Sequence, residues 1–422
     1  MEESERSRLR TGLAQRGGSV TESGSGSSRA TGVKRADEHD FAALASFFQQ
    51  VWDSSATSDG VRAAWTSEAE VNPVDPGIPP PAYVFLKDGD VIGYVSTIPA
   101  RFLVGGCRRD GYWLKGLWVL PDHRGGPVGF HLARAAASEL GPLGALAVAK
   151  PARRLFEAVG FRDVAQPPNY VWPLRPSRLF GRLDPSSVLD GGESWTSRLW
   201  RVAQRTRMAG PVGAAATLAL RAGRRRVNQA EVQVTQGWAG FPPDEVDTLW
   251  RAMAKPEYCG LVRDAAYLEW RYGRRVPRGY RPIMVRGEGG KGEGGLRAVA
   301  VLRLPELQES GRFAGVRLAW LCDLIFDPDD PVSTKAAHAA LQHAELVARE
   351  CGGDLLALSF AGPGYDRIFS DRRYIRRSPS VHLLLKGFDE VERAMGDQGD
   401  GSQRAPCSWV VARGDGDSDG AS

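Results

Sequence analysis

The chain has 422 residues, 42% of them apolar, which is enough for two or three domains with buried cores. Its 55 basic and 50 acidic residues give a net charge of +5, a mild excess that does not by itself indicate nucleic-acid binding. No apolar run approaches the roughly 18 residues of a transmembrane helix, and the first residues lack the apolar stretch of a secretory signal. We therefore expect a cytoplasmic protein.

The cysteines and histidines show no metal-binding or disulfide pattern. The five cysteines are scattered without a C-x-x-C pair, and the six histidines form no H-E-x-x-H motif. This usage fits a reducing compartment, and we expect neither a disulfide framework nor a metal site.

The first elements fall in the range 31–175, after a tail at 1–30 that is rich in Ser, Gly, Thr and Arg and is expected to be disordered. Apolar residues between Phe41 and Trp52 have helical spacing. The turn Asp88-Gly89-Asp90 then separates two apolar runs, as in a β-hairpin. A third apolar run covers 113–120.

A glycine-rich loop follows this third run. Residues 117–129 read Leu-Trp-Val-Leu-Pro-Asp-His-Arg-Gly-Gly-Pro-Val-Gly, and helical spacing begins at Val128. A strand that enters a helix through such a loop presents unpaired backbone N–H groups to an anion. The loop lacks the Gly-Lys-Ser/Thr of a Walker motif and the G-x-G-x-x-G of a Rossmann fold.

The loop resembles the pyrophosphate loop of the GNAT acyltransferase superfamily, Val-x-Pro-x-x-Arg-Gly-x-Gly-x-Gly/Ala. The matching positions are Val119, Pro121, Arg124, Gly125 and Gly129. Upstream, residues 89–93 match the family's G-x-V-x-G, and downstream, residues 152–161 resemble its LYEKLGF element. The resemblance covers roughly residues 33 to 173.

This resemblance implies a binding site for acetyl-CoA or another acyl-CoA as co-substrate. The residues that it assigns to the site are Leu117, Trp118, Val119, Arg124, Gly125, Gly126, Val128 and Gly129. One departure is Pro127, which replaces the family's middle glycine and has no N–H to donate.

The resemblance does not identify the acid and the base of the reaction in this sequence. Phe156 stands where the family often has a tyrosine that protonates the thiolate. Asp323 is a weak candidate acid, with a turn-capping role as its alternative. Lys115 could contact an acceptor or point to solvent.

A basic connector is expected at 176–230. Its part from 195 to 230 holds eight arginines and no acidic residue around the apolar run 214–220. This pattern is compatible with a helix packed between domains, with peripheral membrane contact, or with nucleic acid. We expect the packed helix and no nucleic acid.

The range 231–388 repeats the order of the first unit. Trp320, Leu321, Leu324, Pro328 and Asp329 align with equivalent residues of the first unit, from Trp113 onward. The loop glycines are missing from this copy, so its coenzyme site is expected to be degenerate. The tail at 389–422 is expected to be mostly disordered, apart from the apolar segment 409–412, which could dock on a globular part.

The fold class expected is therefore α/β, with two GNAT-like domains, each a mixed, mostly antiparallel twisted sheet flanked by helices. The function expected is acyl-CoA-dependent N-acyl transfer to a small-molecule or glycan amine. Two alternatives stay open. One is a tandem-domain aminoacyltransferase that uses aminoacyl-tRNA, which the loop disfavours. The other is a non-catalytic scaffold, which Pro127 and Phe156 favour.

Overall fold

The computed structural model describes residues 31–70, 74–148, 150–183, 232–273, 279–287, 294–309, 313–379, 381–388 and 409–415, with a few single positions between 198 and 215. The expected tail at 1–30 lies outside these residues, as does nearly all of the basic connector from 195 to 230. Among the described helices, none is long and apolar enough to cross a membrane.

The first half of the chain follows the expected order of elements. Its strands are β1 (Gly32–Arg35), β2 (Ala82–Lys87), β3 (Asp90–Val104), β4 (Cys107–Val119), β5 (Leu143–Leu146), β6 (Arg162–Ala165) and β7 (Asn169–Pro173). Its helices are η1 (Glu38–Asp40), α2 (Phe41–Val51), α3 (Ser58–Glu70), η2 (Pro121–His123), α4 (Val128–Glu139), α5 (Lys150–Ala158) and α6 (Pro176–Arg182).

The second half repeats this order, with the additional short strand β9 between helices α9 and α10. Its strands are β8 (Val232–Gln236), β9 (Cys259–Leu261), β10 (Tyr280–Gly287), β11 (Leu296–Leu307), β12 (Arg317–Phe326), β13 (Leu355–Ser359), β14 (Ile375–Arg377), β15 (Leu383–Lys386) and β16 (Trp409–Val410). Its helices are α9 (Pro243–Met253), α10 (Ala265–Arg271), α11 (Pro331–Glu350) and α12 (Tyr365–Asp371).

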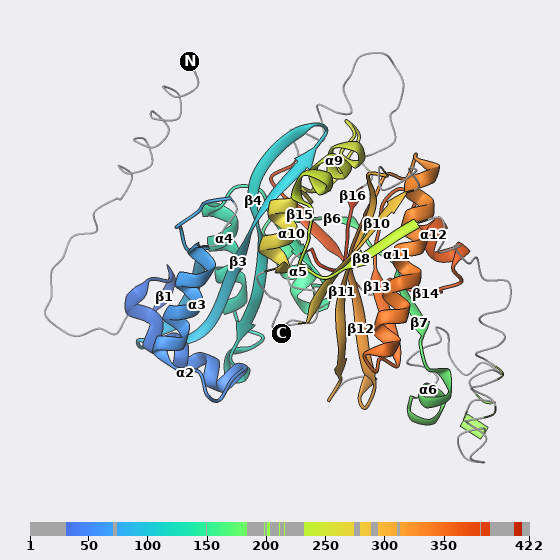
Figure 1. Ribbon diagram of the computed structural model, residues 1–422. Coiled ribbons are helices and arrows are strands. Elements are labelled where there is room, and N and C mark those ends of the chain that lie inside the picture. The colour runs from blue at the N-terminus through green and yellow to red at the C-terminus, as the bar shows by residue number, and fades with distance from the viewer. Residues whose placement is uncertain are drawn as a thin grey trace, which may run out of the picture.

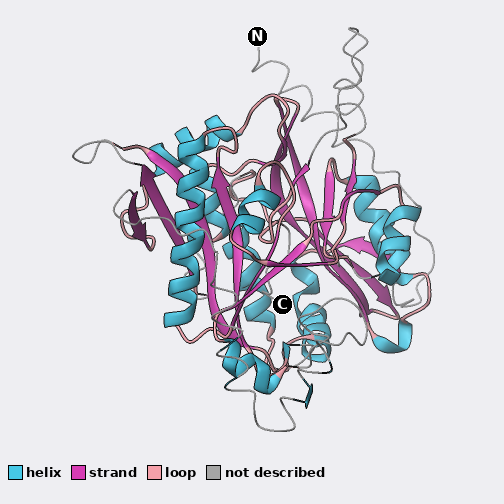
Figure 2. Ribbon diagram, turned by 90° about the vertical axis from the view of Figure 1, so that its right-hand side faces the viewer, coloured by secondary structure: helices cyan, strands magenta, loops and turns pink. Residues whose placement is uncertain are grey.

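Two mixed sheets stand side by side with helices packed against them, and α9 and α10 lie in the centre of Figure 1, between the two sheets (Figures 1 and 2). In the described residues, the first sheet runs β1-β2-β3-β4-β5-β15-β6, and β9 and β16 extend it beside β3. The second runs β14-β7-β13-β12-β11-β10-β8. The fold is therefore α/β with two GNAT-like domains, as the sequence predicts.

Each half contributes strands to the sheet of the other, since β9 of the second half already extends the first sheet beside β3. β7 from the first half lies between β13 and β14 of the second sheet. β15 from the second half lies between β5 and β6 of the first sheet. The ranges 31–175 and 231–388 therefore do not coincide with the two sheets, because each sheet needs a strand from the other range.

Helix α4 packs on one face of the first sheet, and α2 and α3 pack on the other. Gly93 of β3 allows α4 to approach closely, since a Cβ at this position would lie 2.7 Å from Val128 and 2.9 Å from Leu132. The last glycine of the G-x-V-x-G motif thus has a packing role. It brings the start of α4, and with it the glycine loop, against the end of β4.

Part of the C-terminal tail is packed into the protein. β16 pairs in parallel with β9, and Val411 exchanges two backbone hydrogen bonds of 3.0 Å with Ala361. Trp409, Val410, Val411 and Ala412 are buried. The apolar segment that the sequence marks as able to dock therefore docks on β9, a strand of the first sheet, and on Ala361, which follows β13 of the second sheet.

Candidate active site

The candidate site lies where β4 and β5 separate. These parallel strands pair only at Tyr112–Leu143 and Trp113–Gly144. Beyond Trp113, β4 continues to Val119 with no described strand on that side. Backbone groups of the last residues of β4 are thus open to a ligand along one edge, beside the loop that leads into α4.

The loop presents free donors to this opening. Gly125 has a φ of +79°, a left-handed conformation that glycine adopts without strain. Within the described residues, the backbone N–H groups of Gly125, Gly126, Val128 and Gly129 donate no hydrogen bond. The N–H of Arg124 differs from these, because it donates to the carbonyl of Pro121 at 3.1 Å. The predicted phosphate cradle therefore has fewer available amides than the range 124–129 suggests.

Pro127 does not disturb the helix. It is the N-cap of α4, with φ −79° and ψ −6°, and its carbonyl accepts from His131 N–H at 2.9 Å. A proline at this end removes no intrahelical hydrogen bond, because the first N–H groups of a helix have no partner in it. The macrodipole at this terminus still favours an anion.

The two glycines after the turn have different surroundings. A Cβ on Gly126 would meet only the carbonyl oxygen of His123 at 3.6 Å, an ordinary contact. A Cβ on Gly129 would lie 3.2 Å from the Leu155 side chain, at the packed junction of α4 and α5. Gly126 is therefore free to face a ligand, whereas Gly129 has a packing role as well.

The other predicted site residues contribute in different ways. Leu117 and Val119 pack toward α4, and the Val128 side chain is buried, so only their backbones remain for a ligand. Trp118 is 37% exposed on the opposite face. The guanidinium of Arg124 lies 5.4 Å from the Trp118 ring, and its Nε donates to Val119 O at 3.0 Å. Arg124 is thus held at the end of β4.

No hydroxyl replaces the missing tyrosine in α5. Phe156 is 4% exposed and packs edge-on against Phe161, with ring centroids 5.1 Å apart. It cannot protonate a thiolate.

The equivalent position in the second domain is not an anion site. At the start of α11, Asp330 accepts the Val332 N–H at 2.9 Å, and Asp327 accepts the Asp329 N–H at 3.0 Å. Lys255 bonds Asp327 at 2.9 Å and also contacts Asp329. The carboxylates already cap this helix end and would repel a diphosphate.

The gap beside β12 in the second domain is filled by the chain itself. β12 pairs with β13 only from Leu318 to Leu321. Beyond that point, Gly414 N–H donates to Cys322 O at 2.7 Å, and Tyr365 Oη donates to Leu324 O at 2.8 Å. The C-terminal segment thus occupies the place that corresponds to the open edge of β4.

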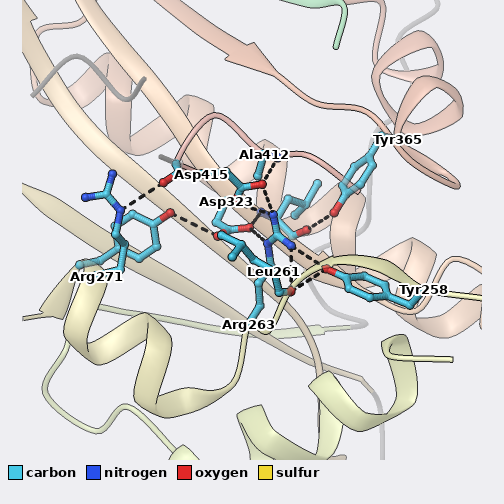
Figure 3. Close-up of polar contacts among 11 residues, drawn as sticks. Tyr258, Leu261, Arg263, Arg271, Asp323, Tyr365, Ala412 and Asp415 are labelled. Carbon is cyan, nitrogen blue, oxygen red and sulfur yellow. Dashed lines mark hydrogen bonds and ion pairs between the residues drawn. The ribbon is translucent and has the colours of Figure 1, made fainter. Parts of the chain in front are cut away.

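Asp323 belongs to a buried polar network at this place (Figure 3). Asp323 has no exposed area, and its Oδ1 accepts from Arg263 Nε at 3.0 Å. The Tyr272 hydroxyl donates to its other oxygen at 3.2 Å. Burial raises the pKa of Asp323, while Arg263 lowers it. A carboxylate sealed in this way does not reach a substrate, so the structure does not support Asp323 as a catalytic acid.

The opposite face of the first sheet holds a cavity that sequence reasoning did not identify. It has a volume of about 330 Å³ and lies between the sheet and helices α2 and α3. Its aromatic walls are Phe48, Trp52, Trp65, Tyr94 and Trp118. Lys115 and Glu68 also line it, with Nζ and Oε1 4.0 Å apart. The Lys115 side chain thus lines the cavity and remains 28% exposed, so both of the roles expected for it stay predictions.

A bulge in β4 directs these side chains. Tyr94 and Ser96 of β3 pair with Trp118 and Lys115 of β4, so two steps on β3 face three on β4. Gly116 lies in the extra step with a φ of +61°. As a result, Lys115 and Trp118 both face the cavity, although strict alternation would separate them.

Comparison with known proteins agrees with this architecture. A model of the acetyltransferase (GNAT) family matches residues 45–161. The matched range lies within the first domain and contains the glycine loop and α4. No curated protein matches the sequence.

Two solved structures are similar in fold to most of this chain. One is a conserved protein from Enterococcus faecalis V583, described as a probable N-acyltransferase, with 9% identity and a TM-score of 0.51 over 85% of this chain and 72% of that chain. The other is the N-myristoyltransferase of Saccharomyces cerevisiae with bound myristoyl-CoA, with 12% identity and a TM-score of 0.51 over 87% and 85%. At these identities the likeness is one of fold.

Proposed function

We propose that this protein is an acyl-CoA-dependent N-acyltransferase whose first domain binds the co-substrate between β4 and β5. The observation that carries the proposal is the set of free N–H groups at Gly125, Gly126, Val128 and Gly129, beside the open edge of β4. The family match over 45–161 supports it, as does the yeast neighbour with its bound acyl-CoA.

The proposed reaction depends mainly on backbone groups and needs few side chains. The loop amides and the α4 terminus bind the diphosphate, and a backbone N–H among residues 117–119 polarises the thioester carbonyl. The lone pair of the acceptor amine attacks this carbon, a C–N bond forms, and the C–S bond breaks. The proton lost by the nitrogen ends on the thiolate, so the products are an amide and a free thiol.

Titration calorimetry of the full-length protein with acetyl-CoA tests the proposal. We expect one binding site per chain, because the second domain has carboxylates at its equivalent helix end. Circular dichroism of the same sample verifies that it is folded. A folded protein that gives no binding heat with acetyl-CoA or with myristoyl-CoA at millimolar concentration would favour the non-catalytic alternative.

A further inference from the structure

The residues that line the cavity between α2, α3 and the first sheet indicate which kind of ligand it can bind. Five aromatic rings line it, and Phe48 lies 5.0 Å from Trp52 and 5.2 Å from Tyr94 between ring centroids. Trp52 is 43% exposed, so this wall is open rather than sealed in the core. An apolar group of moderate size fits such a site.

Two charged side chains enter this aromatic cavity, Glu68 from α3 and Lys115 from β4. Their separation of 4.0 Å is long for an ion pair, and both are partly exposed. The hydroxyls of Thr97 and Ser96 in the lining are already engaged, since Thr97 donates to Pro81 O at 2.7 Å and Ser96 to Lys115 O at 3.2 Å. The carboxylate of Glu68 and the ammonium of Lys115 are the charged groups of the lining, and they are suited to recognise a charged ligand.

The cavity and the proposed transfer site share strand β4. Lys115 and Gly116 belong to the bulge of β4, and Trp118 lies between the cavity and Arg124 of the loop. A ligand in the cavity would thus meet β4 from one face, while the co-substrate runs along its open edge. This arrangement places the cavity ligand as the acyl acceptor.

We propose that the acceptor is an α-amino acid with an apolar side chain, an inference that rests on the proposed acyl transfer. The aromatic walls receive the side chain, Glu68 binds the α-ammonium, and Lys115 binds the α-carboxylate. The charges of the ligand and of the site then match one to one.

A simple amine matches this site less well. Its ammonium would approach Glu68 next to the ammonium of Lys115, and two like charges a few ångströms apart repel each other. An acyl chain would bring no partner for either charged group. The zwitterion is the occupant that leaves both Glu68 and Lys115 compensated.

The same geometry gives Glu68 a chemical role. Its carboxylate takes the proton from the α-ammonium, directly or through one water, and the freed lone pair attacks the thioester carbonyl. The departing thiolate takes up one proton, which balances the proton lost by the ammonium. The overall reaction therefore converts an amino acid and acyl-CoA into an N-acyl amino acid and the free coenzyme thiol.

Binding measurements on the full chain test the inference without depending on turnover. Three tryptophans line the cavity, so a ligand that enters it changes the intrinsic fluorescence. We expect L-phenylalanine and L-leucine to bind about tenfold or more tightly than phenethylamine or L-alanine, since each of these two lacks one of the matched groups. Thiol release with acetyl-CoA should follow the same order.

Variants separate the two charges. Lys115→Met should weaken L-phenylalanine binding about tenfold but strengthen phenethylamine binding, because it removes the like charge next to the amine, whereas Glu68→Gln should weaken both. The exposed residues Lys87 and Glu70 supply matched controls, Lys87→Met and Glu70→Gln. Equal binding of phenethylamine and L-phenylalanine would overturn the amino-acid assignment in favour of a simple amine.

The outcomes also distinguish this inference from the proposed function. If acetyl-CoA binds while no amino acid does, the acceptor assignment fails and the acyltransferase proposal stands. If the amino acids bind and acetyl-CoA does not, the cavity is a recognition site and the acyltransferase proposal fails.

Discussion

Arg263 and Asp415 form a buried ion pair across 152 positions of sequence. Both carboxylate oxygens of Asp415 lie 2.7 Å from the same guanidinium nitrogen, and both side chains are buried. The Ala412 N–H also donates to Asp415 at 2.9 Å, and Arg271 Nε donates to Gly414 O at 3.1 Å. The described residues 409–415 are thereby held in place, and they fill the gap beside β12.

Loss of this pair should destabilise the whole protein. Asp415→Ala leaves Arg263 with one carboxylate instead of two in a buried position, and we expect the free energy of unfolding to fall by about 3 kcal/mol or more. Urea unfolding followed by fluorescence measures this change. The control Asp244→Ala removes an exposed carboxylate and should cost less than about 0.5 kcal/mol. A similar small loss in both variants would show that the C-terminal segment is not tightly bound.

The stability should depend on pH through Asp415. Burial, with the neighbouring Asp323 adding to it, raises the pKa of Asp415 from 3.8 to about 6, although Arg263 opposes the shift. Between these values the folded state keeps a proton that the unfolded state has lost, so the stability contributed by this group falls as pH rises from about 4 to about 6. Asp415→Asn has no such proton. The free energy of unfolding of the wild type minus that of the variant should therefore decrease over this range, and an increase would show that Arg263 keeps the carboxylate ionised throughout.

The glycine loop offers a variant that separates binding from folding. A valine at Gly126 has open space in the ligand-free protein but would project toward the proposed phosphates. We expect Gly126→Val to weaken acetyl-CoA binding by at least about 2 kcal/mol, with little change in melting temperature. Gly141→Val, also in open space but away from the loop, serves as the control. Unchanged affinity in Gly126→Val would place the diphosphate elsewhere.

The strand exchange predicts that the two halves cannot be separated by cutting the chain. A protease site inserted between residues 203 and 210 leaves β7 in the second sheet and β15 in the first. Leu384 of β15 has no exposed area and belongs to the core around α4. After cleavage we expect both fragments to elute together in size-exclusion chromatography and to part only in denaturant. Separation in buffer alone would contradict the reciprocal pairing.

Short sequence patterns predicted those parts of the fold and of the site that neighbouring residues in the sequence determine. The turn at Asp88-Gly89, the meander and the loop from Arg124 to Gly129 follow from residues close together in sequence. The exchange of β7 and β15 could not be predicted in this way, because the sequence of a short apolar strand is compatible with either sheet. The docking of 409–415 depends on Arg263, far away in sequence. The cavity was missed because strict alternation from Leu114 would place Lys115 and Trp118 on opposite faces, and the bulge reverses this.

The bulge itself can be tested at Gly116. Its φ of +61° is unfavourable for a β-branched residue, whereas asparagine adopts this conformation more readily. A Cβ here would lie 3.6 Å from the Trp52 ring, which is ordinary contact, so the cost of substitution is conformational rather than steric. We expect Gly116→Val to lower the free energy of unfolding by about 1–2 kcal/mol, and Gly116→Asn to cost distinctly less. Because the bulge aims Lys115 and Trp118 into the cavity, Gly116→Val should also alter the fluorescence response to L-phenylalanine. Equal destabilisation by valine and asparagine would mean that contact with Trp52, and not the left-handed backbone, limits this position.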